Sequence, residues 1–334
     1  MLKIYDVFEL HYTGKDSHGS TLTELPDGRI MAVWYSGTAE KHHDVGIYQS
    51  FFDKTTEKWS PPTLLEKQDQ NTSEGNPVIY FDEPTNRLWL FWVTMDRANA
   101  KRMKGGWSTC KMKCKHSEDL GKTWSTSRYL IKTWGKMTRN KPIRLSNGDV
   151  LLPIYSEWAG YKANFLICSA ESFAQGALKS KWKKIGPITG NILQPTVVEL
   201  EPGHLLAYHR TVKSGKFKGW ITAAESKNYG RSWGKIYKVE LRNPNGGIDM
   251  VKLQDGRIAL AFNNSSTERN PLCIGISSDD GKTWPKIIEL ENTPGERFGY
   301  PAIIQCKDGS IYCTYTNKRG INIRCAKLEI SDLS

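Results

Sequence analysis

STLTELPDGRIMAVWYSG, at residues 20–37, joins two apolar runs through an Asp-Gly pair, Asp27 and Gly28. This pair is a strong hairpin signal, because both residues tolerate the positive φ angles that tight hairpin turns require. Five further segments repeat the pattern of an apolar run, a turn and a second apolar run. They are PVIYFDEPTNRLWLFWVT (77–94), PIRLSNGDVLLPIYSE (142–157), PTVVELEPGHLLAYHRT (195–211), IDMVKLQDGRIALAFNNS (248–265) and PAIIQCKDGSIYCTYTNK (301–318). The sequence therefore predicts six hairpins of one kind.

The spacing of the hairpins indicates a repeat architecture. Their turn glycines are Gly28, Gly148, Gly203, Gly256 and Gly309, and Asn86 stands in the longer turn of the second copy. The last three separations are 55, 53 and 53 residues, and the first two units together span 120. A repeat of about fifty residues built from hairpins is typical of a β-propeller, and each unit leaves room for two more strands.

These patterns predict an all-β fold, a single six-bladed β-propeller domain over residues 1–334. A strand near Ile4–Leu10 is expected to pair with the C-terminal segment Ile321–Ile330, so that the N- and C-terminal strands share a blade. Such closure removes the free sheet edges that promote aggregation. Comparable helical periodicity is absent from the sequence, and no linker rich in Pro, Gly and Ser divides it.

A second pattern, S-x-[DN]-x-G-x-[ST]-W, occurs at SEDLGKTW (117–124), SKNYGRSW (226–233) and SSDDGKTW (277–284). Its Ser and Asp or Asn side chains suit the amides of a turn, and its Gly supplies a positive φ. We interpret these segments as structural turns in which Trp124, Trp233 and Trp284 are mostly buried. They resemble the Asp-box, or bacterial neuraminidase repeat, of the sialidase superfamily. Together with the six hairpins, this resemblance covers nearly the whole chain and implies the sialidase type of propeller.

The composition restricts the class of partner. The formal net charge is +12, which suits an anionic partner such as an acidic glycan. Neither a nucleic-acid-binding motif nor a long Lys/Arg run is present, so we expect no nucleic acid partner. No stretch has the apolar length that a membrane span needs, and MLKIYDVFEL lacks the features of a signal peptide. We expect a cytoplasmic protein, or a secreted one if a leader was removed; the sequence does not determine its oligomeric state.

The cysteines do not predict a disulfide framework, because their number, seven, is odd. Cys110, Cys114 and His116 look like metal ligands at first, but their segment reads as a strand. Strand positions four apart are roughly 13 Å from each other, which is too far to share one ion. We therefore predict no metal site and no cofactor.

Polar side chains precede or end the inner strands of all six predicted blades. In a propeller these positions line one funnel at the central axis. We expect His18, Asn76, Arg139, Gln194, Arg210, Arg269 and Tyr300 to converge on one pocket at one end of that axis. Asn245 and Arg297 occupy similar positions and join the predicted substrate-binding residues.

The resemblance implies roles for some of these residues. Sialidases bind the sugar carboxylate with three arginines and use a Tyr nucleophile, a Glu that activates it and an Asp acid/base. Arg210 and Arg269 look like the second and third arginines, and Tyr300 looks like the nucleophile. His18 stands where the family has its first arginine, and Gln194 stands where it has the activating Glu. Gln194 cannot accept the tyrosine proton, so Tyr300 needs another acceptor, with Glu74, Glu157 and His18 as candidates.

The acid/base is either Glu40 or Asp44 in GTAEKHHDVGIY, with Glu40 in the more loop-like position. Arg139 and Arg297 are possible replacements for the missing positive charge, which would suit another acidic sugar such as a uronic acid.

Three functions remain open at this point. The first is a glycoside hydrolase acting on a terminal acidic sugar, with Tyr300 as nucleophile. The second is a polysaccharide lyase that cleaves uronate-containing glycans by β-elimination, for which His18, Tyr300, Arg210 and neutral Gln194 are suitable groups. The third is a non-catalytic glycan-binding propeller. A carboxylate within hydrogen-bond reach of the Tyr300 hydroxyl would favour hydrolysis, and a histidine there without a carboxylate would favour elimination.

Overall fold

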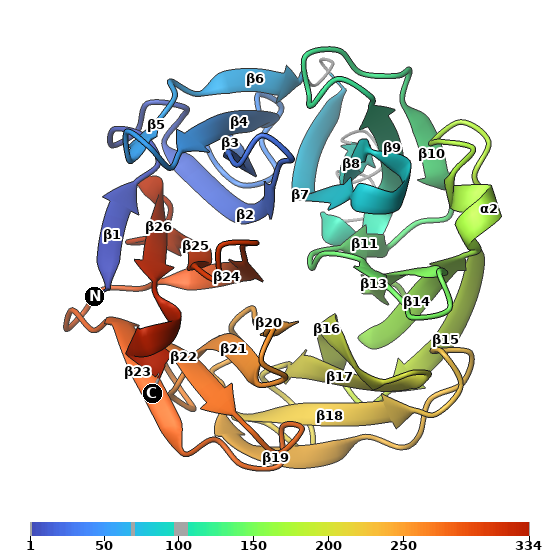
Figure 1. Cartoon of the computed structure of the whole chain (residues 1–334), viewed down its shortest axis with the longest axis vertical. Coiled ribbons are helices and arrows are strands. Elements are labelled where there is room, and N and C mark those ends of the chain that lie inside the picture. The colour runs from blue at the N-terminus through green and yellow to red at the C-terminus, as the bar shows by residue number, and fades with distance from the viewer. Residues whose placement is uncertain (1, 68–70, 97–105, 334) are drawn as a thin grey trace.

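The computed structural model describes residues 2–67, 71–96 and 106–333, and this part of the chain forms six antiparallel sheets around one central axis (Figure 1). The first two sheets contain β2 (Asp16–Glu24), β3 (Ile30–Gly37), β4 (Gly46–Asp53), β5 (Lys58–Trp59) and β6 (Thr63–Glu66), then β7 (Thr72–Asp82), β8 (Arg87–Asp96), β9 (Cys110–Ser117) and β10 (Arg128–Ile131). The third contains β11 (Lys136–Thr138), β12 (Ile143–Arg144), β13 (Val150–Ser156), β14 (Lys162–Cys168) and β15 (Lys183–Thr189).

The fourth and fifth sheets contain β16 (Ile192–Glu201), β17 (His204–Thr211), β18 (Trp220–Ser226) and β19 (Tyr237–Arg242), then β20 (Asp249–Lys252), β21 (Ile258–Asn263), β22 (Leu272–Ser277) and β23 (Lys286–Glu291). The sixth contains β24 (Gly299–Gln305), β25 (Ile311–Asn317), β26 (Asn322–Leu328) and β1 (Lys3–Asp6). The described helices are short: η1 (Glu83–Thr85), η2 (Trp107–Thr109), α2 (Ala170–Phe173) and η3 (Ile330–Leu333). None of them is long and apolar enough to cross a membrane.

The ring closes as the sequence predicts. The N-terminal β1 pairs antiparallel with β26, with Ile4 opposite Ala326 and Tyr5 opposite Cys325. In Figure 1 the blue β1 lies beside the red strands of the last blade. This confirms the predicted six-bladed propeller in which the N-terminal and C-terminal strands share one blade.

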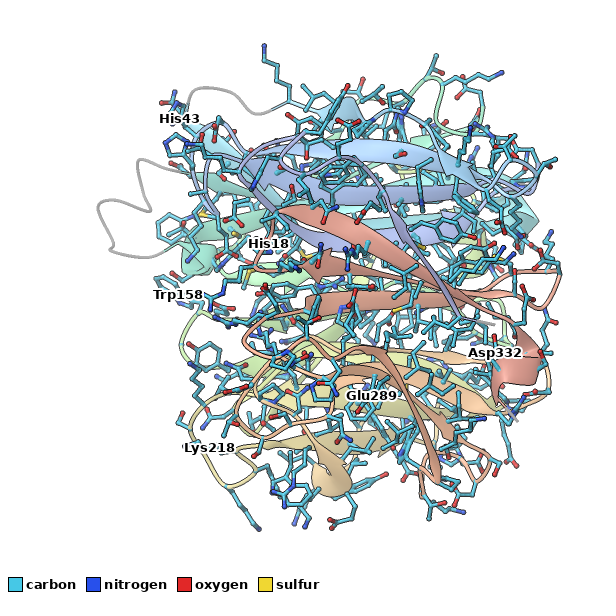
Figure 2. All side chains as sticks on the ribbon, turned by 90° about the vertical axis from the view of Figure 1, so that its left-hand side faces the viewer. His18, His43, Trp158, Lys218, Glu289 and Asp332 are labelled. Carbon is cyan, nitrogen blue, oxygen red and sulfur yellow. The ribbon has the colours of Figure 1, made fainter. Side chains whose placement is uncertain are left out.

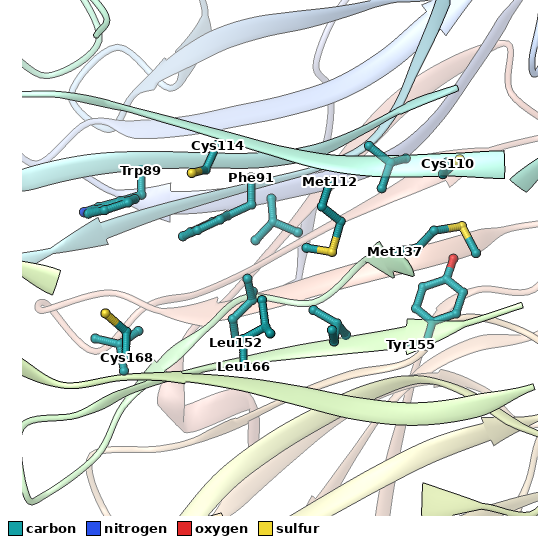
Figure 3. Close-up of a cluster of buried hydrophobic side chains, with 14 of the residues drawn as sticks. Trp89, Phe91, Cys110, Met112, Cys114, Met137, Leu152, Tyr155, Leu166 and Cys168 are labelled. Atoms are coloured by element: carbon teal, nitrogen blue, oxygen red, sulfur yellow. The ribbon is translucent and has the colours of Figure 1, made fainter. Parts of the chain in front are cut away.

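Apolar side chains fill the space between neighbouring blades. Figure 3 shows one such cluster, in which Trp89, Phe91 and Met112 of the second blade face Leu152 and Leu166 of the third. The hairpin strands β8 and β13 are buried on both faces, which explains why the hairpin sequences read as nearly continuous apolar runs. This packing fixes the angle between blades and thereby the positions of the inner strands.

The three Asp-box segments are tight turns, as predicted. In the first of them the Ser117 hydroxyl accepts from the Gly121 amide at 2.9 Å, and the Asp119 carboxylate accepts from the Thr123 amide at 2.8 Å. The third box repeats both bonds through Ser277 and Asp279. Trp124, Trp233 and Trp284 have most of their surface covered, as predicted, and each packs against an apolar cluster beside its turn.

The buried His209 should make the protein less stable at acidic pH. It lies on β17, on the same face as the core residues Leu205 and Ala207. Burial lowers the pKa of His209 to about 4, and the Thr222 backbone opposes this shift only in part. Between about pH 6.5, its unfolded pKa, and about pH 4, the unfolded chain binds a proton at His209 more readily than the folded chain does. The free energy of unfolding is therefore highest above about pH 6.5 and falls as the pH drops towards about 4, by up to about 1.4 kcal/mol for each pH unit. Urea unfolding of the wild type and His209→Leu between those pH values should show a steeper loss in the wild type. Parallel pH profiles would contradict this expectation.

Candidate active site

A cavity of about 340 Å³ opens at one end of the propeller axis. It is lined by His18, Glu40, Arg269, Arg297, Phe298, Gly299, Tyr300, Thr316 and Arg319. Figure 2 shows His18 on the same side of the propeller as His43, Trp158 and Lys218, and Asp332 on the other side. Three arginines against one glutamate give the cavity a positive potential, which favours an anionic ligand.

The inner strands reach this cavity through a repeated distortion. Their pairing register shifts between His18 and Thr21, Gly75 and Val78, Leu193 and Thr196, and Gly299 and Ala302. Inside each shift one residue has a positive φ: Gly19 (63°), Asn76 (44°), Gln194 (49°) and Tyr300 (52°). A bulge re-aims side chains at a strand, and positive φ is uncommon for residues other than glycine. Three blades thus place a strained non-glycine position beside the axis, as often happens at functional sites, and the first blade has Gly19 there.

Tyr300 lies among positive charges. The Arg269 guanidinium carbon is 4.9 Å from the centre of the Tyr300 ring, and that of Arg139 is 5.6 Å away. Burial raises the pKa of Tyr300, but the charges of Arg269 and Arg210 outweigh this effect and leave the pKa below its ordinary value. The ionised phenol, which is the more nucleophilic form, is therefore easier to reach at this site than in a free tyrosine.

Glu40 and His18 form the wall that faces Tyr300. Tyr35 donates a hydrogen bond to Glu40 Oε1 at 3.0 Å, and the Glu40 amide donates to Asp16 at 2.9 Å. His18 Nε2 is 2.5 Å from the other oxygen of Asp16, and the His18 ring meets the Tyr300 ring edge-on at 5.9 Å. Burial raises the pKa of Asp16, but the hydrogen bond and charge of His18 hold it below its usual range. An Asp–His pair thus lies beside the tyrosine.

Arg210 and Gln194 belong to a polar network behind the cavity lining. Arg210 donates to Gln194 Oε1 at 3.0 Å, and Gln194 Nε2 donates to the Tyr155 hydroxyl at 3.3 Å. Asn76 donates to the same hydroxyl at 3.1 Å. Gln194 therefore connects Arg210 to Tyr155 through an uncharged amide.

Glu157 faces the same network. Burial raises the pKa of Glu157, the charges of Arg210 and Lys41 oppose the rise, and the charge of Glu40 adds to it. In the described residues neither a carboxylate nor a histidine is hydrogen-bonded to the Tyr300 hydroxyl, so the geometry expected to separate hydrolysis from elimination is met for neither reaction; His18 contacts Tyr300 only through its ring. Glu74, one of the candidate acceptors, is occupied instead by Trp92 Nε1 at 2.7 Å and Thr94 Oγ1 at 2.9 Å.

Six of the predicted site residues lie outside the lining of the cavity, so the expected convergence on one pocket holds only in part. Arg210, Gln194 and Asn76 belong to the network behind it, and the other three are Arg139, Asn245 and Asp44. Arg139 is only 1% exposed, and its guanidinium donates to the backbone carbonyls of Ser20, Tyr300 and Pro301. In this position Arg139 holds the backbone at Tyr300 and does not face a substrate in the cavity. The backbone carbonyl of Asn245 accepts from Arg269 at 3.1 Å, so Asn245 also acts through a neighbour.

Asp44 accepts from the Thr38 amide and hydroxyl and pairs with His42 at 2.8 Å. Burial raises the pKa of Asp44, but these hydrogen bonds lower it to about 2, so Asp44 stays ionised as a loop anchor. Of the two acid/base candidates, Glu40 is the one that lines the cavity. His18, Arg269, Arg297 and Tyr300 lie in the lining with it.

Sequence reasoning missed Tyr35, Tyr155 and Arg319. Tyr35 and Tyr155 hold Glu40 and Gln194, as described above, and Arg319 lines the cavity. A signal for the first two was present, because both precede Ser at the end of the second run of a hairpin, in VWYSG and PIYSE. Arg319 follows the last hairpin in a turn with φ of 67° and carries no comparable signal.

No group of three or more His, Cys, Asp or Glu side chains suited to a metal ion occurs in residues 2–67, 71–96 and 106–333. A larger cavity, about 760 Å³, lies at the outer rim between the N-terminal segment and Trp59. It is lined mainly by aromatic, aliphatic and proline side chains such as Phe8, Leu10 and Pro61. The convergence of charged groups from several blades singles out the smaller axial cavity.

Comparisons with known proteins identify the family and the fold. The model of the BNR repeat-like domain family matches residues 28–313. No curated protein matches the chain significantly. Among solved structures, a Hadza microbial sialidase matches with a TM-score of 0.80 and 16% identity, over 98% of this chain and 69% of the other.

Two further structures match over nearly their whole length. The intramolecular trans-sialidase from Ruminococcus gnavus, solved with oseltamivir carboxylate, has a TM-score of 0.74 and 15% identity, with 99% of this chain and 98% of that chain covered. A protein of unknown function from Dyadobacter fermentans has a TM-score of 0.78 and 16% identity, with 98% and 99% covered. At these identities the likeness shows a shared fold.

Proposed function

The chain belongs to the BNR repeat-like domain family. We propose that it is a glycoside hydrolase that removes a terminal acidic sugar from a glycan. The observation that carries the proposal is Tyr300, a half-buried phenol whose pKa is lowered by Arg269 and Arg210, in a cavity with Glu40. The fold shared with sialidases and a trans-sialidase supports a sugar as the ligand of this cavity.

Arginines supply the recognition of the acid. Arg269, Arg297 and Arg319 line the cavity, and a guanidinium binds a carboxylate through two parallel hydrogen bonds. The sugar carboxylate then lies near Tyr300. An ionised phenol next to a carboxylate is tolerated here because the arginines balance both charges.

The chemistry proceeds in two displacements. In the first, Tyr300 Oη forms a bond to the anomeric carbon while the bond to the leaving oxygen breaks, and Glu40 donates a proton to that oxygen. In the second, Glu40 takes a proton from water, the water oxygen bonds to the anomeric carbon, and Tyr300 is released. Tyr35, by its hydrogen bond to Glu40, keeps the carboxyl aimed at the cavity.

Gln194 changes how the nucleophile is prepared. A carboxylate at this position would accept the tyrosine proton, whereas the amide only orients Arg210. We propose that the positive charges of Arg269 and Arg210 favour the loss of the Tyr300 proton without a paired base, as the lowered pKa of Tyr300 supports.

Gln194→Glu tests this preparation. The new carboxylate would pair with Arg210 and cancel part of its effect, so the pKa of Tyr300 should rise by roughly 1 pH unit or more. The phenolate absorbance of the wild type, Gln194→Glu and Tyr300→Phe, followed against pH, reports this pKa. A tyrosine titration unaltered by Gln194→Glu would count against ionisation by Arg210.

A polysaccharide lyase is the second candidate, and the Asp16–His18 pair beside Tyr300 is the observation that favours it. β-Elimination needs a base for the proton next to the carboxylate and an acid for the leaving oxygen. His18 and Tyr300 are adjacent and able to divide these roles, and the arginines would neutralise the uronate carboxylate.

A paired assay separates the two reactions. The protein is offered sialosides and uronic-acid glycans, and both new reducing ends and the ultraviolet absorbance of an unsaturated uronate are recorded. Reducing ends without absorbance support hydrolysis, and both signals together support elimination. Binding of acidic glycans with neither signal, unchanged in Tyr300→Phe, would leave the non-catalytic glycan-binding function.

A further inference from the structure

Two large aromatic side chains are exposed in one short loop beside the candidate site. Trp158 is 44% exposed and Tyr161 is 40% exposed, and both lie in the loop that joins β13 and β14. A single exposed apolar residue on a surface needs no explanation. The arrangement around Trp158, however, is held in place from several sides.

A second tryptophan fixes the position of the first. The rings of Trp134 and Trp158 meet edge to face, with centres 5.8 Å apart. Their two loops are joined by a hydrogen bond from the Glu157 amide to the Gly135 carbonyl at 3.1 Å. Gly135 has a φ of 68°, and a Cβ there would lie 2.6 Å from that of Trp158, so the close approach requires glycine. A ring held in this way loses little freedom when a ligand stacks on it.

The tryptophan pair is continuous with the axial site. Burial raises the pKa of Glu157, the residue before Trp158; the charge of Arg210 opposes this rise and that of Glu40 adds to it, so Glu157 lies within reach of both groups. Figure 2 shows Trp158 on the same side of the propeller as His18. The cavity itself, about 340 Å³, is near the lower end of the range for small-molecule pockets, so a longer glycan has to leave it across the rim.

We propose that Trp158, held by Trp134, is a stacking subsite for the pyranose ring on the leaving-group side of the glycan. The assignment of that side rests on the hydrolase function proposed above. The apolar face of a pyranose packs on an indole ring, while its hydroxyl groups stay in water. The subsite thus selects glycans with a sugar, rather than a small alcohol, attached to the acidic residue.

Binding measurements test the subsite apart from catalysis. N-acetylneuraminic acid, 3′-sialyllactose and lactose are titrated against the wild type, Trp158→Ala and Trp158→Phe, with Tyr129→Ala as an exposed aromatic control on the outer strand β10. Trp158→Ala should weaken 3′-sialyllactose about tenfold and leave N-acetylneuraminic acid unchanged. Trp158→Phe should restore most of the loss, and Tyr129→Ala should behave as the wild type. Thermal unfolding of each variant excludes a folding defect as the cause.

The outcomes distinguish the subsite from the function on which it rests. If Trp158→Ala binds and turns over 3′-sialyllactose as the wild type does, the subsite is wrong and the hydrolase proposal stands. If the wild type turns over no glycan, yet lactose quenches its tryptophan fluorescence and this quenching is absent from Trp158→Ala, the subsite stands and the hydrolase proposal fails. Equal loss of affinity for the monosaccharide and the trisaccharide would place Trp158 in the cavity site and overturn the assignment to the leaving-group side.

Discussion

Tyr300→Phe is expected to reduce turnover of the cognate glycan by more than about a thousandfold, because it removes the attacking oxygen and nothing else. The contact of Arg139 with position 300 goes to the backbone carbonyl and is independent of the hydroxyl. The Arg269 guanidinium lies over the ring, which phenylalanine keeps. Binding of the glycan and thermal stability should therefore stay close to those of the wild type.

Tyr35→Phe is the matched control, since it removes the hydroxyl of another tyrosine at the same site. That hydroxyl donates to Glu40 and has no role as nucleophile, so the loss of turnover should be much smaller. Rates are measured under single-turnover conditions, and affinities by calorimetry. Full activity in Tyr300→Phe, or a larger defect in Tyr35→Phe, would remove Tyr300 from the mechanism.

The fold was predictable because its unit is local. Each hairpin carries its own turn signal, such as Asp27-Gly28, and the six copies repeat at nearly constant spacing. Closure through β1 was predictable too, because only residues 319–334 follow the last hairpin and the N-terminal strand was available to complete its blade. Short-range signals were sufficient because a propeller adds equivalent units around one axis.

The site was predictable only in outline. Funnel positions pointed to His18, Arg269 and Tyr300, which do line the cavity. The bulges that aim these residues were not predictable, because Gln194 and Tyr300 have no intrinsic preference for positive φ. Tertiary packing imposes that conformation. An arginine next to an inner strand also gives no indication of whether it faces the ligand or, like Arg139, the backbone beneath.

Arg210→Ala should differ from Tyr300→Phe by affecting binding as well as rate. Arg210 is 8% exposed, and its charge lowers the pKa of Tyr300 and opposes the rise in that of Glu157. Without it, the phenol is less ionised and the site has one positive charge fewer for the sugar carboxylate. We expect kcat/KM to fall by the equivalent of about 2–4 kcal/mol, with a weaker complex as part of the loss.

Arg210→Lys separates the charge from the shape of the guanidinium. Lysine keeps a positive charge near Tyr300 but lacks the planar guanidinium that positions Arg210 on Gln194 Oε1. The kcat/KM of Arg210→Lys should therefore lie between that of the wild type and that of Arg210→Ala. Arg231→Ala, which removes an exposed arginine paired with Asp149 away from the cavity, should leave both rate and affinity unchanged. The pH–rate profile gives the deciding measurement: the limb that reports Tyr300 should move to higher pH in Arg210→Ala and much less in Arg210→Lys. A uniform loss of rate with an unmoved profile would show that Arg210 holds the substrate without acting on the nucleophile.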